Sequence, residues 1–516
     1  MRRGLGIILA VVLLAGFAAA AADQPLIIGT TDRVTELSFE NSWDMWTWHV
    51  LRATTGALVK LDETTLLPTG DLASSWEVSA DGLVYTFHIR PGVTFWDGEK
   101  CDAAAVKWAL DRTIRLNGPD GAVSALLIPV ISKIEATGPM TVVITLNQPN
   151  VTFLLIMSSQ VACSLIYSPK STPENEFARG RYAGTGPYVL KQYVPDQQIV
   201  YEAFDKYYGT APKSKNVIEK MYQDAATLRA AIEAGDIDVA FRTLSPQDIK
   251  DLETKPNVVI TKWPPSPGIR YIAFNVIQPP VDVQQVREAI AYAVNRDVIV
   301  AQVFGGSVDP IYTMVPKVDP PFFGAIDVFP KRDIAIAKSL LAQVGYNASH
   351  KLKLNLWYTT KHYGTFEADV ASVIKASLEE TGVIEITLQA LEWAAYIPKV
   401  GAGEMDMYMF GWHPDYLETS NYLAPWLTEG SESMGTYFTH HPNYQAYVDI
   451  LQVATATLDE TIRSKLYAAV QVLSATDIPF IPLWSMTDEV VLATRPGVKG
   501  AKLDITMDIA IWNIYK

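Results

Sequence analysis

Residues 75–98 read SWEVSADGLVYTFHIRPGVTFWDG, and this stretch decides the fold class. Ser79-Ala80-Asp81-Gly82 predicts a tight turn that joins SWEV to LVYTFHIR, whose alternating apolar residues are typical of a half-buried strand. Pro91-Gly92 ends that strand, and Trp96-Asp97-Gly98 predicts another turn. Asp102 is then placed to cap a helix with Val106, Trp108, Ala109 and Leu110 on its inner side. The stretch therefore predicts a β-hairpin followed by a helix.

Strands and helices alternate along the rest of the chain. Segment 227–241 predicts a helix, a Gly stop and a strand, and segment 396–410 repeats that pattern. Segment 283–304 predicts one helix, and the apolar run 407–412 predicts a buried strand. The proline-rich KWPPSPG, 262–268, predicts a crossing between domains. Alternation of this kind favours α/β lobes, and 516 residues are too many for one hydrophobic core.

The first 22 residues have the layout of a secretory signal peptide: two arginines, an apolar run and small residues before Asp23. A retained membrane anchor is the alternative. Cleavage would remove Arg2 and Arg3 from 42 basic residues, set against 56 acidic ones, so the net charge would move from −14 to −16. This charge argues against nucleic acid as a partner. Cys101 and Cys163 are expected as two separate buried thiols rather than a disulfide.

Catalytic and metal-binding motifs are absent from the sequence. It contains no HExxH, CxxC, GxSxG, GxGxxG or P-loop pattern, and its histidines lack a metal-binding spacing. Ser372 and Lys375 have the SxxK form of acyl-transfer serine enzymes, but neither SDN nor KTG accompanies them. We therefore expect neither an enzyme nor a cofactor or metal, and a secreted serine hydrolase is the rival of another class.

The 71–112 block resembles the signature region of the extracytoplasmic solute-binding proteins of ABC transporters, family 5. The residues that carry the resemblance are Trp76, Ser79, Asp81, Gly82, Arg90, Gly92, Val93, Phe95, Asp97 and Gly98. GTGPYVL (184–190), VREAIAYAVNRD (286–297) and the GW-x-x-D stretch that begins at Gly411 follow in the family's order. The likeness covers nearly the whole chain after residue 22.

The resemblance implies a fold of the type II periplasmic-binding-protein kind, with two principal lobes and an extra α+β domain of the cluster C kind. The first lobe would comprise 23–50, 185–270 and 488–516. The extra domain would comprise 51–184, and the second principal lobe 271–487. The signature block would then support the fold of the extra domain rather than touch a ligand.

The stretch GWHPDYLE, 411–418, carries the expected ligand site. In peptide-binding relatives the Asp of GW-x-x-D meets the ligand's α-ammonium group, and Asp415 stands at that place. The alternative is that Asp415 has no contact with a ligand and either caps the helix expected near Thr419 or is solvated. The expected ligand-binding residues are Asp415, Trp412, Trp393, Asn275, His362, Tyr363 and Tyr416.

The sequence departs from the family pattern where dipeptide-specific relatives place an Arg after the strand that here ends LWY. This chain has YTTKHYG, 358–364, and neither Lys361 nor His362 reproduces the bidentate fork of Arg. Strict selection for dipeptide length is therefore in doubt.

The expected function is the solute-binding component of an ABC importer, located in the periplasm or otherwise outside the cytoplasm. It would be a monomer that captures a peptide-like solute and delivers it to membrane permease subunits. An oligosaccharide or a metal chelate is the alternative solute, and a sensor or holder of extended chains is a further alternative.

Overall fold

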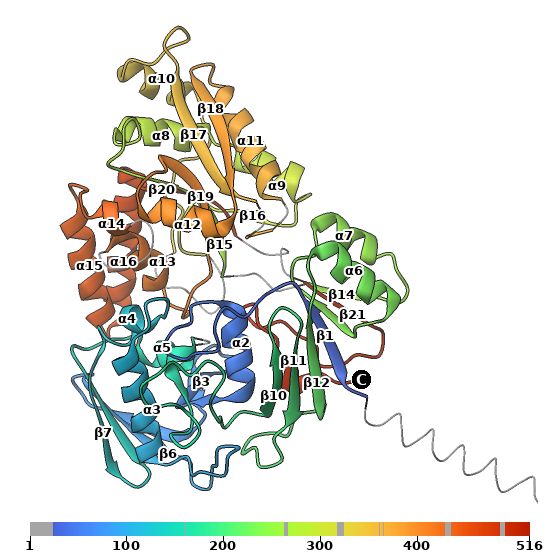
Figure 1. Ribbon diagram of the computed structural model, residues 1–516. Helices are drawn as coiled ribbons and strands as arrows, with labels where there is room; N and C mark the ends of the chain where they lie inside the picture. The colour runs from blue at the N-terminus through green and yellow to red at the C-terminus, as the bar shows by residue number, and fades with distance from the viewer. Residues whose placement is uncertain are drawn as a thin grey trace, which may run out of the picture.

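The computed structural model describes residues 24–159, 161–262, 267–316, 325–360, 362–364, 366–428, 435–485 and 491–516. The predicted signal peptide, Lys361 and most of KWPPSPG lie outside these ranges. Figure 1 shows an upper lobe, formed by residues 269–485, above a broader lower part that contains both the early chain and its last residues. Within the described ranges, no helix has the length and apolar content needed to cross a membrane.

The lower lobe is built on a seven-stranded sheet whose order is β10-β11-β12-β1-β13-β21-β14. Strand β1 pairs in parallel with β12 and β13, so the carboxyl ends of these three strands lie at one edge. Helices α6 (Ala225–Ala234) and α7 (Pro246–Leu252) cover one face, and α2 (Met45–Thr54) packs on the other. The strands are β1 (Leu26–Thr30), β10 (Tyr188–Val194), β11 (Gln198–Ala203), β12 (Asn216–Met221), β13 (Val239–Phe241), β14 (Val259–Lys262) and β21 (Val491–Thr494).

The upper lobe is built on a six-stranded sheet whose order is β16-β20-β15-β19-β17-β18. Strand β17 runs parallel to β18 and β19, while β15 runs antiparallel to β19. The strands are β15 (Ile269–Phe274), β16 (Asp309–Pro310), β17 (Leu352–Thr359), β18 (Ile384–Leu391), β19 (Met407–Trp412) and β20 (Phe480–Ser485). The helices are α8 (Gln284–Ala293), α9 (Arg296–Val303), α10 (Ile334–Gln343), α11 (Glu367–Glu379), α12 (Trp393–Gly401), α13 (Ser420–Leu427), α14 (Gly435–Phe438), α15 (Tyr444–Ala456) and α16 (Glu460–Asp477). A continuous apolar core fills this lobe.

The extra domain is a four-stranded antiparallel sheet, β5-β6-β8-β7, packed against α3 (Ala103–Leu116). The hairpin and helix predicted from 75–112 are confirmed: Gly82 has φ +71° in the turn, and the Asp102 side chain accepts from the backbone N–H groups of Ala104 and Ala105. The strands are β5 (Ala73–Val78), β6 (Val84–Ile89), β7 (Ile131–Gly138) and β8 (Thr141–Leu146), beside the short pairs β2 (Gly56–Ala57) with β9 (Leu165–Ile166) and β3 (Val59–Leu61) with β4 (Pro68–Gly70). Its other helices are α4 (Val123–Leu126), α5 (Phe153–Ser158) and the 3₁₀ turn Ala162–Ser164; a second 3₁₀ turn, Ile511–Asn513, lies near the carboxyl terminus.

The single helix predicted over 283–304 is wrong, because the structure has two. Val294 is extended and ends α8, and Asn295 caps α9 by accepting from the backbone N–H of Val298 at 3.2 Å. An Asn side chain that hydrogen-bonds to a nearby N–H offers the backbone an alternative to continuing a helix. The apolar periodicity continues across Val294 and Asn295, so the sequence pattern did not indicate that one helix ends there and another begins.

The extra domain also touches the upper lobe directly. The backbone N–H of Val151 donates to the carbonyl of Thr455, on α15, at 3.0 Å. Close by, a Cβ built on Gly82 would lie 3.9 Å from the side chain of Leu458, which follows α15. The three parts of the chain therefore meet one another, beyond the segments that connect them in sequence.

A buried ionic group holds α2 to the lower sheet and to the end of the chain. The His49 ring contacts Glu219 of β12 at 2.7 Å and Asp508 on its other nitrogen, and Arg52 Nη1 contacts Asp508 at 2.7 Å. Burial lowers the pKa of His49, but Asp508 and Glu219 outweigh that effect and raise it to about 10. His49 is therefore protonated at neutral pH, between two carboxylates.

We expect His49→Gln to lower the free energy of unfolding by about 3–5 kcal/mol at pH 6, because two buried carboxylates lose their cation. The folded-state pKa of about 10 lies above the ordinary value of 6.5. The contribution of the charged ring is therefore complete below pH 6.5 and is lost as the pH rises through about 10. Urea denaturation of both proteins at pH 6, 8 and 10 measures this; His88→Gln, at a half-exposed histidine, is the control. A stability difference that stays constant across these pH values would contradict the assignment.

Candidate functional site

The carboxyl ends of parallel strands in both large sheets lie at the boundary between the lobes. In the lower lobe, Thr31 and Asp32 follow β1, and Arg242 follows β13. In the upper lobe, His362 and Tyr363 follow β17, Trp393 follows β18, and the loop 413–418 follows β19. Figure 1 shows β1 running toward the upper lobe, with α12 and β19 at the facing side. In open α/β sheets this is the position at which ligands bind.

Asp415 lies in the loop 413–418, which connects β19 to α13 of the upper lobe at the boundary between the lobes. Its side chain accepts from Trp43 Nε1 at 3.2 Å and from Asn421 Nδ2 at 3.3 Å, and its backbone N–H donates to Asn421 Oδ1 at 2.8 Å. The side chain is buried, so it is not a solvated loop acid. Nor does it cap α13, because the Glu418 carboxylate accepts from the Ser420 N–H in that role, at 2.6 Å. Asp415 is therefore neither a solvated acid nor the cap of α13.

Trp43 comes from the lower part of the molecule, and sequence reasoning missed it. It precedes α2, so its hydrogen bond to Asp415 joins residues 372 positions apart. Tyr416, next to Asp415, also packs against the apolar core of the lower lobe and extra domain. The negative charge of Asp415 contributes, after burial, to raising the pKa of Cys163 in the extra domain. The 413–418 loop is therefore enclosed by residues of both other parts.

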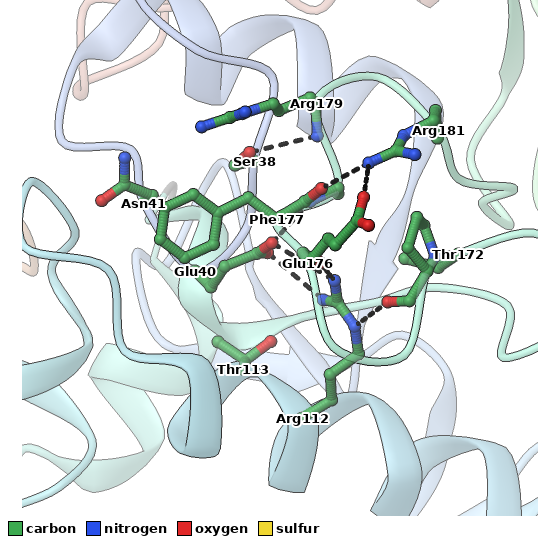
Figure 2. Close-up of polar contacts among 12 residues, drawn as sticks. Ser38, Glu40, Asn41, Arg112, Thr113, Thr172, Glu176, Phe177, Arg179 and Arg181 are labelled. Carbon is green, nitrogen blue, oxygen red and sulfur yellow. Dashed lines mark hydrogen bonds and ion pairs between the residues drawn. The ribbon is translucent and has the colours of Figure 1, made fainter.

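A buried polar network fixes the segment that carries Trp43 (Figure 2). Arg112, on α3, forms an ion pair with Glu40 at 3.3 Å, and both side chains are almost fully buried. Glu40 also accepts from the backbone N–H of Ala178 at 2.5 Å, and Arg112 Nε donates to the carbonyl of Pro173 at 2.7 Å. The network therefore ties the irregular chain just before Trp43 to the extra domain at several points.

The aromatic side chains predicted for the site form a group in the upper lobe. The His362 ring stacks on Trp393 with centroids 3.5 Å apart and planes 5° apart, and Tyr363 meets Trp393 edge-on at 5.6 Å. Tyr363 OH donates to the carbonyl of Gly411 at 3.1 Å, next to Trp412. Arg270 lies over the Tyr363 ring, 3.6 Å from its centroid. These contacts hold His362, Tyr363 and Trp393 together next to the loop that carries Asp415, and we call these three rings the aromatic wall.

Trp412 and Asn275 differ from this group. Trp412 is buried against Trp426, with ring centroids 4.9 Å apart, so it belongs to the apolar core as much as to the site. Asn275 is not brought to the site at all. Strand β15 pairs Ile269 with Trp412 and Phe274 with Met407, so Asn275 lies beyond the opposite end of β19, roughly 20 Å away at 3.4 Å per residue. Its amide donates to the Gly403 carbonyl at 2.9 Å, which is a structural role.

The histidines of the site are neutral. Desolvation of the ring beside Trp393, together with the positive charges of Arg270 and Arg242, lowers the pKa of His362 to about 3, although part of the residue is exposed at the surface. Burial, Arg242 and Arg270 likewise hold the pKa of His413 well below its ordinary value. Neither ring therefore brings positive charge to the site at neutral pH.

The residues of the hydrolase rival do not form a catalytic pair. Ser372 Oγ donates to the carbonyl of Ala368 in its own helix at 2.8 Å, and Lys375 Nζ contacts Glu379 at 2.6 Å. Cys101 and Cys163 are separate buried thiols. Among the described residues, no cluster of three His, Cys, Asp or Glu side chains is arranged to hold a metal ion.

Two cavities lie elsewhere. One of about 1330 Å³ is bounded by α2, the 60–66 loop and the 500–513 segment, and one of about 640 Å³ lies between α7 and the α9–α11 region. Neither is lined by any residue of the predicted site.

Two α/β lobes whose strand ends face each other, with the 413–418 loop of the upper lobe at their boundary, define the fold of a periplasmic binding protein of type II. The chain belongs to the bacterial extracellular solute-binding proteins, family 5, whose model matches residues 68–434. It is 28% identical over 470 residues to the dipeptide-binding protein of Escherichia coli, covering 86% of this chain and 85% of that one. It is 30% identical over 502 residues to the glutathione-binding protein GsiB of Escherichia coli, covering 95% and 94%.

The fold also matches a solved structure. The dipeptide-binding protein of Pseudoalteromonas sp. SM9913 in complex with Met-Leu superposes with a TM-score of 0.82 at 21% identity, covering 96% of this chain and 100% of that one. The α/β fold of the type II kind, predicted from sequence, is confirmed. The family is one of binding proteins rather than enzymes.

We expect His362 to stay neutral from pH 5 to pH 8, because its pKa of about 3 lies below this range. NMR of histidine-labelled protein, with the His362 signal identified by its loss in His362→Gln, should show one unchanging neutral ring over this interval. A titration midpoint inside it would contradict the desolvation of the His362 ring by Trp393 and its proximity to Arg270.

Proposed function

We propose that this protein binds a peptide-like solute between its lobes and delivers it to the membrane permease of an ABC importer, outside the cytoplasm. Residues 1–22 would direct its export. The observation that carries the proposal is the buried carboxylate of Asp415, in a loop at the boundary of the lobes, where Trp43 and Asn421 donate to it. The names of the dipeptide- and glutathione-binding relatives support the solute class.

Asp415 suits an ammonium group for electrostatic reasons. Closure of the lobes excludes water, and in the lower local dielectric a bare ammonium needs a fixed opposite charge. Trp43 and Asn421 are uncharged donors that orient the carboxylate. The wall of His362, Trp393 and Tyr363 offers apolar surface to a peptide side chain, and no charge on its histidine competes for the carboxylate.

We expect Asp415→Asn to lower the affinity for a di- or tripeptide by about 2–5 kcal/mol, because the ligand's ammonium loses a desolvated partner. Isothermal titration calorimetry with Ala-Ala, Ala-Ala-Ala and reduced glutathione measures the change. N-acetylated versions of the peptides, which lack the ammonium, should bind both proteins equally weakly.

Asp449→Asn, an exposed acid on α15, is the matched control and should bind like the unaltered protein. Unchanged peptide affinity in a folded Asp415→Asn protein would refute the role of Asp415. Binding of oligosaccharides in place of peptides would refute the solute class while leaving the transport role.

A further inference from the structure

A second charged group, Arg242, reaches the interlobe boundary from the lower lobe. It is the first residue after β13, beside Thr31 and Asp32 at the end of β1. Its Nη1 lies 3.3 Å from Asp32 Oδ2 and 3.9 Å from Met45 Sδ, and its side chain is 22% exposed. Among the described residues, its Nε and Nη2 make no hydrogen bond. The guanidinium therefore keeps donors for something else.

The backbone at Arg242 has an unusual conformation. Arg242 and Thr243 have φ values of +64° and +59°, which place two consecutive side-chain-bearing residues in the left-handed region. Each such residue costs about 1–2 kcal/mol, and conformations of this kind cluster at ligand sites. The Thr31 hydroxyl donates to the Thr243 hydroxyl at 2.7 Å and so joins this turn to the end of β1. The lower lobe therefore holds Arg242 at its edge in a fixed, strained turn.

The charge of Arg242 affects the pKa values of groups in the upper lobe. Its positive charge contributes, after burial, to the lowered pKa values of His413 and His362, which belong to the upper lobe. The guanidinium is therefore within electrostatic range of both histidine rings.

The other arginines at the boundary are already engaged. Arg270 is buried, 3.3 Å from Glu367, and donates to the Tyr363 carbonyl at 3.0 Å. Arg33 donates to the Thr31, Asp32 and Tyr222 carbonyls and pairs with Asp196 at 3.2 Å. Arg242 is the arginine of this group with both exposure and spare donors.

We propose that Arg242 binds the carboxylate of the solute, so that each lobe holds one end of a zwitterion. The ammonium end meets Asp415 of the upper lobe, and the carboxylate end meets Arg242 of the lower lobe, with Thr243 beside it. This inference rests on the proposed function. The solute would therefore carry both a free ammonium and a free carboxylate. By contacting both lobes, it would favour the arrangement in which they are closed around it.

The test compares peptides with their carboxyl-terminal amides, which keep the ammonium and lose the anion. Calorimetry uses Ala-Ala and Ala-Ala-Ala, each free and amidated, with the unaltered protein, Arg242→Gln and Arg242→Lys. Amidation should weaken binding to the unaltered protein by at least about tenfold, as for loss of a charge-assisted hydrogen bond. In Arg242→Gln, free and amidated peptides should bind within about twofold of each other.

Arg229→Gln is the matched control, since Arg229 lies on α6 of the same lobe and pairs with Asp248 at 2.6 Å. It should discriminate like the unaltered protein. Arg242→Lys keeps the charge but lacks the fork, so it should keep part of the discrimination, and it serves if Arg242→Gln does not fold.

Equal discrimination in Arg242→Gln and the unaltered protein would overturn the inference and leave the proposed function standing. The same holds if peptides bind and amidation changes nothing. If the unaltered protein binds none of the peptides, the proposed function is wrong and the inference falls with it.

Discussion

The buried ion pair of Glu40 and Arg112 supports the contact between the lobes. The chain between β1 and α2 has little regular structure, yet it passes through the interior, where every polar group needs a partner. Arg112 reaches the Glu40 carboxylate and two carbonyl groups of the 173–176 segment, and Glu40 accepts from Ala178. A neutral pair could not satisfy as many groups in so small a volume. Removal of either charge would leave the other buried and would release the segment that ends at Trp43.

The charged and titratable groups around the 413–418 loop come from both lobes. Two histidines lie at the boundary, but desolvation and the nearby Arg270 and Arg242 keep them neutral. Arg270 is neutralised by Glu367, deep in the upper lobe. Asp415 of the upper lobe and Arg242 of the lower lobe, which pairs with Asp32 at 3.3 Å, are the charged groups proposed to meet the solute, inside a protein whose net charge is −14. Local geometry, rather than net charge, therefore governs what such a site selects.

Sequence reasoning reached the fold class because its signals are local. The Ser79–Gly82 turn, the Asp102 cap and the strand alternation act within a few residues, and the structure reproduces each of them. The break at Asn295 was missed because apolar periodicity continues through it. Asn275 was grouped with the site because sequence does not reveal which end of a strand faces the ligand. The partnership of Trp43 with Asp415 and the exposed turn at Arg242 depend on packing between distant segments, and no short pattern announces either.

The contact between Val151 and Thr455 has a consequence for how the molecule changes shape. It is a backbone hydrogen bond between the extra domain and the upper lobe, with Leu458 beside the turn at Gly82. A bond of this type is exchanged for bonds to water at a net cost of only about 1 kcal/mol. Separation of the upper lobe from the extra domain at this point would therefore cost little free energy. A solute that binds one arrangement of the lobes better than another by a few kcal/mol would decide which arrangement is populated.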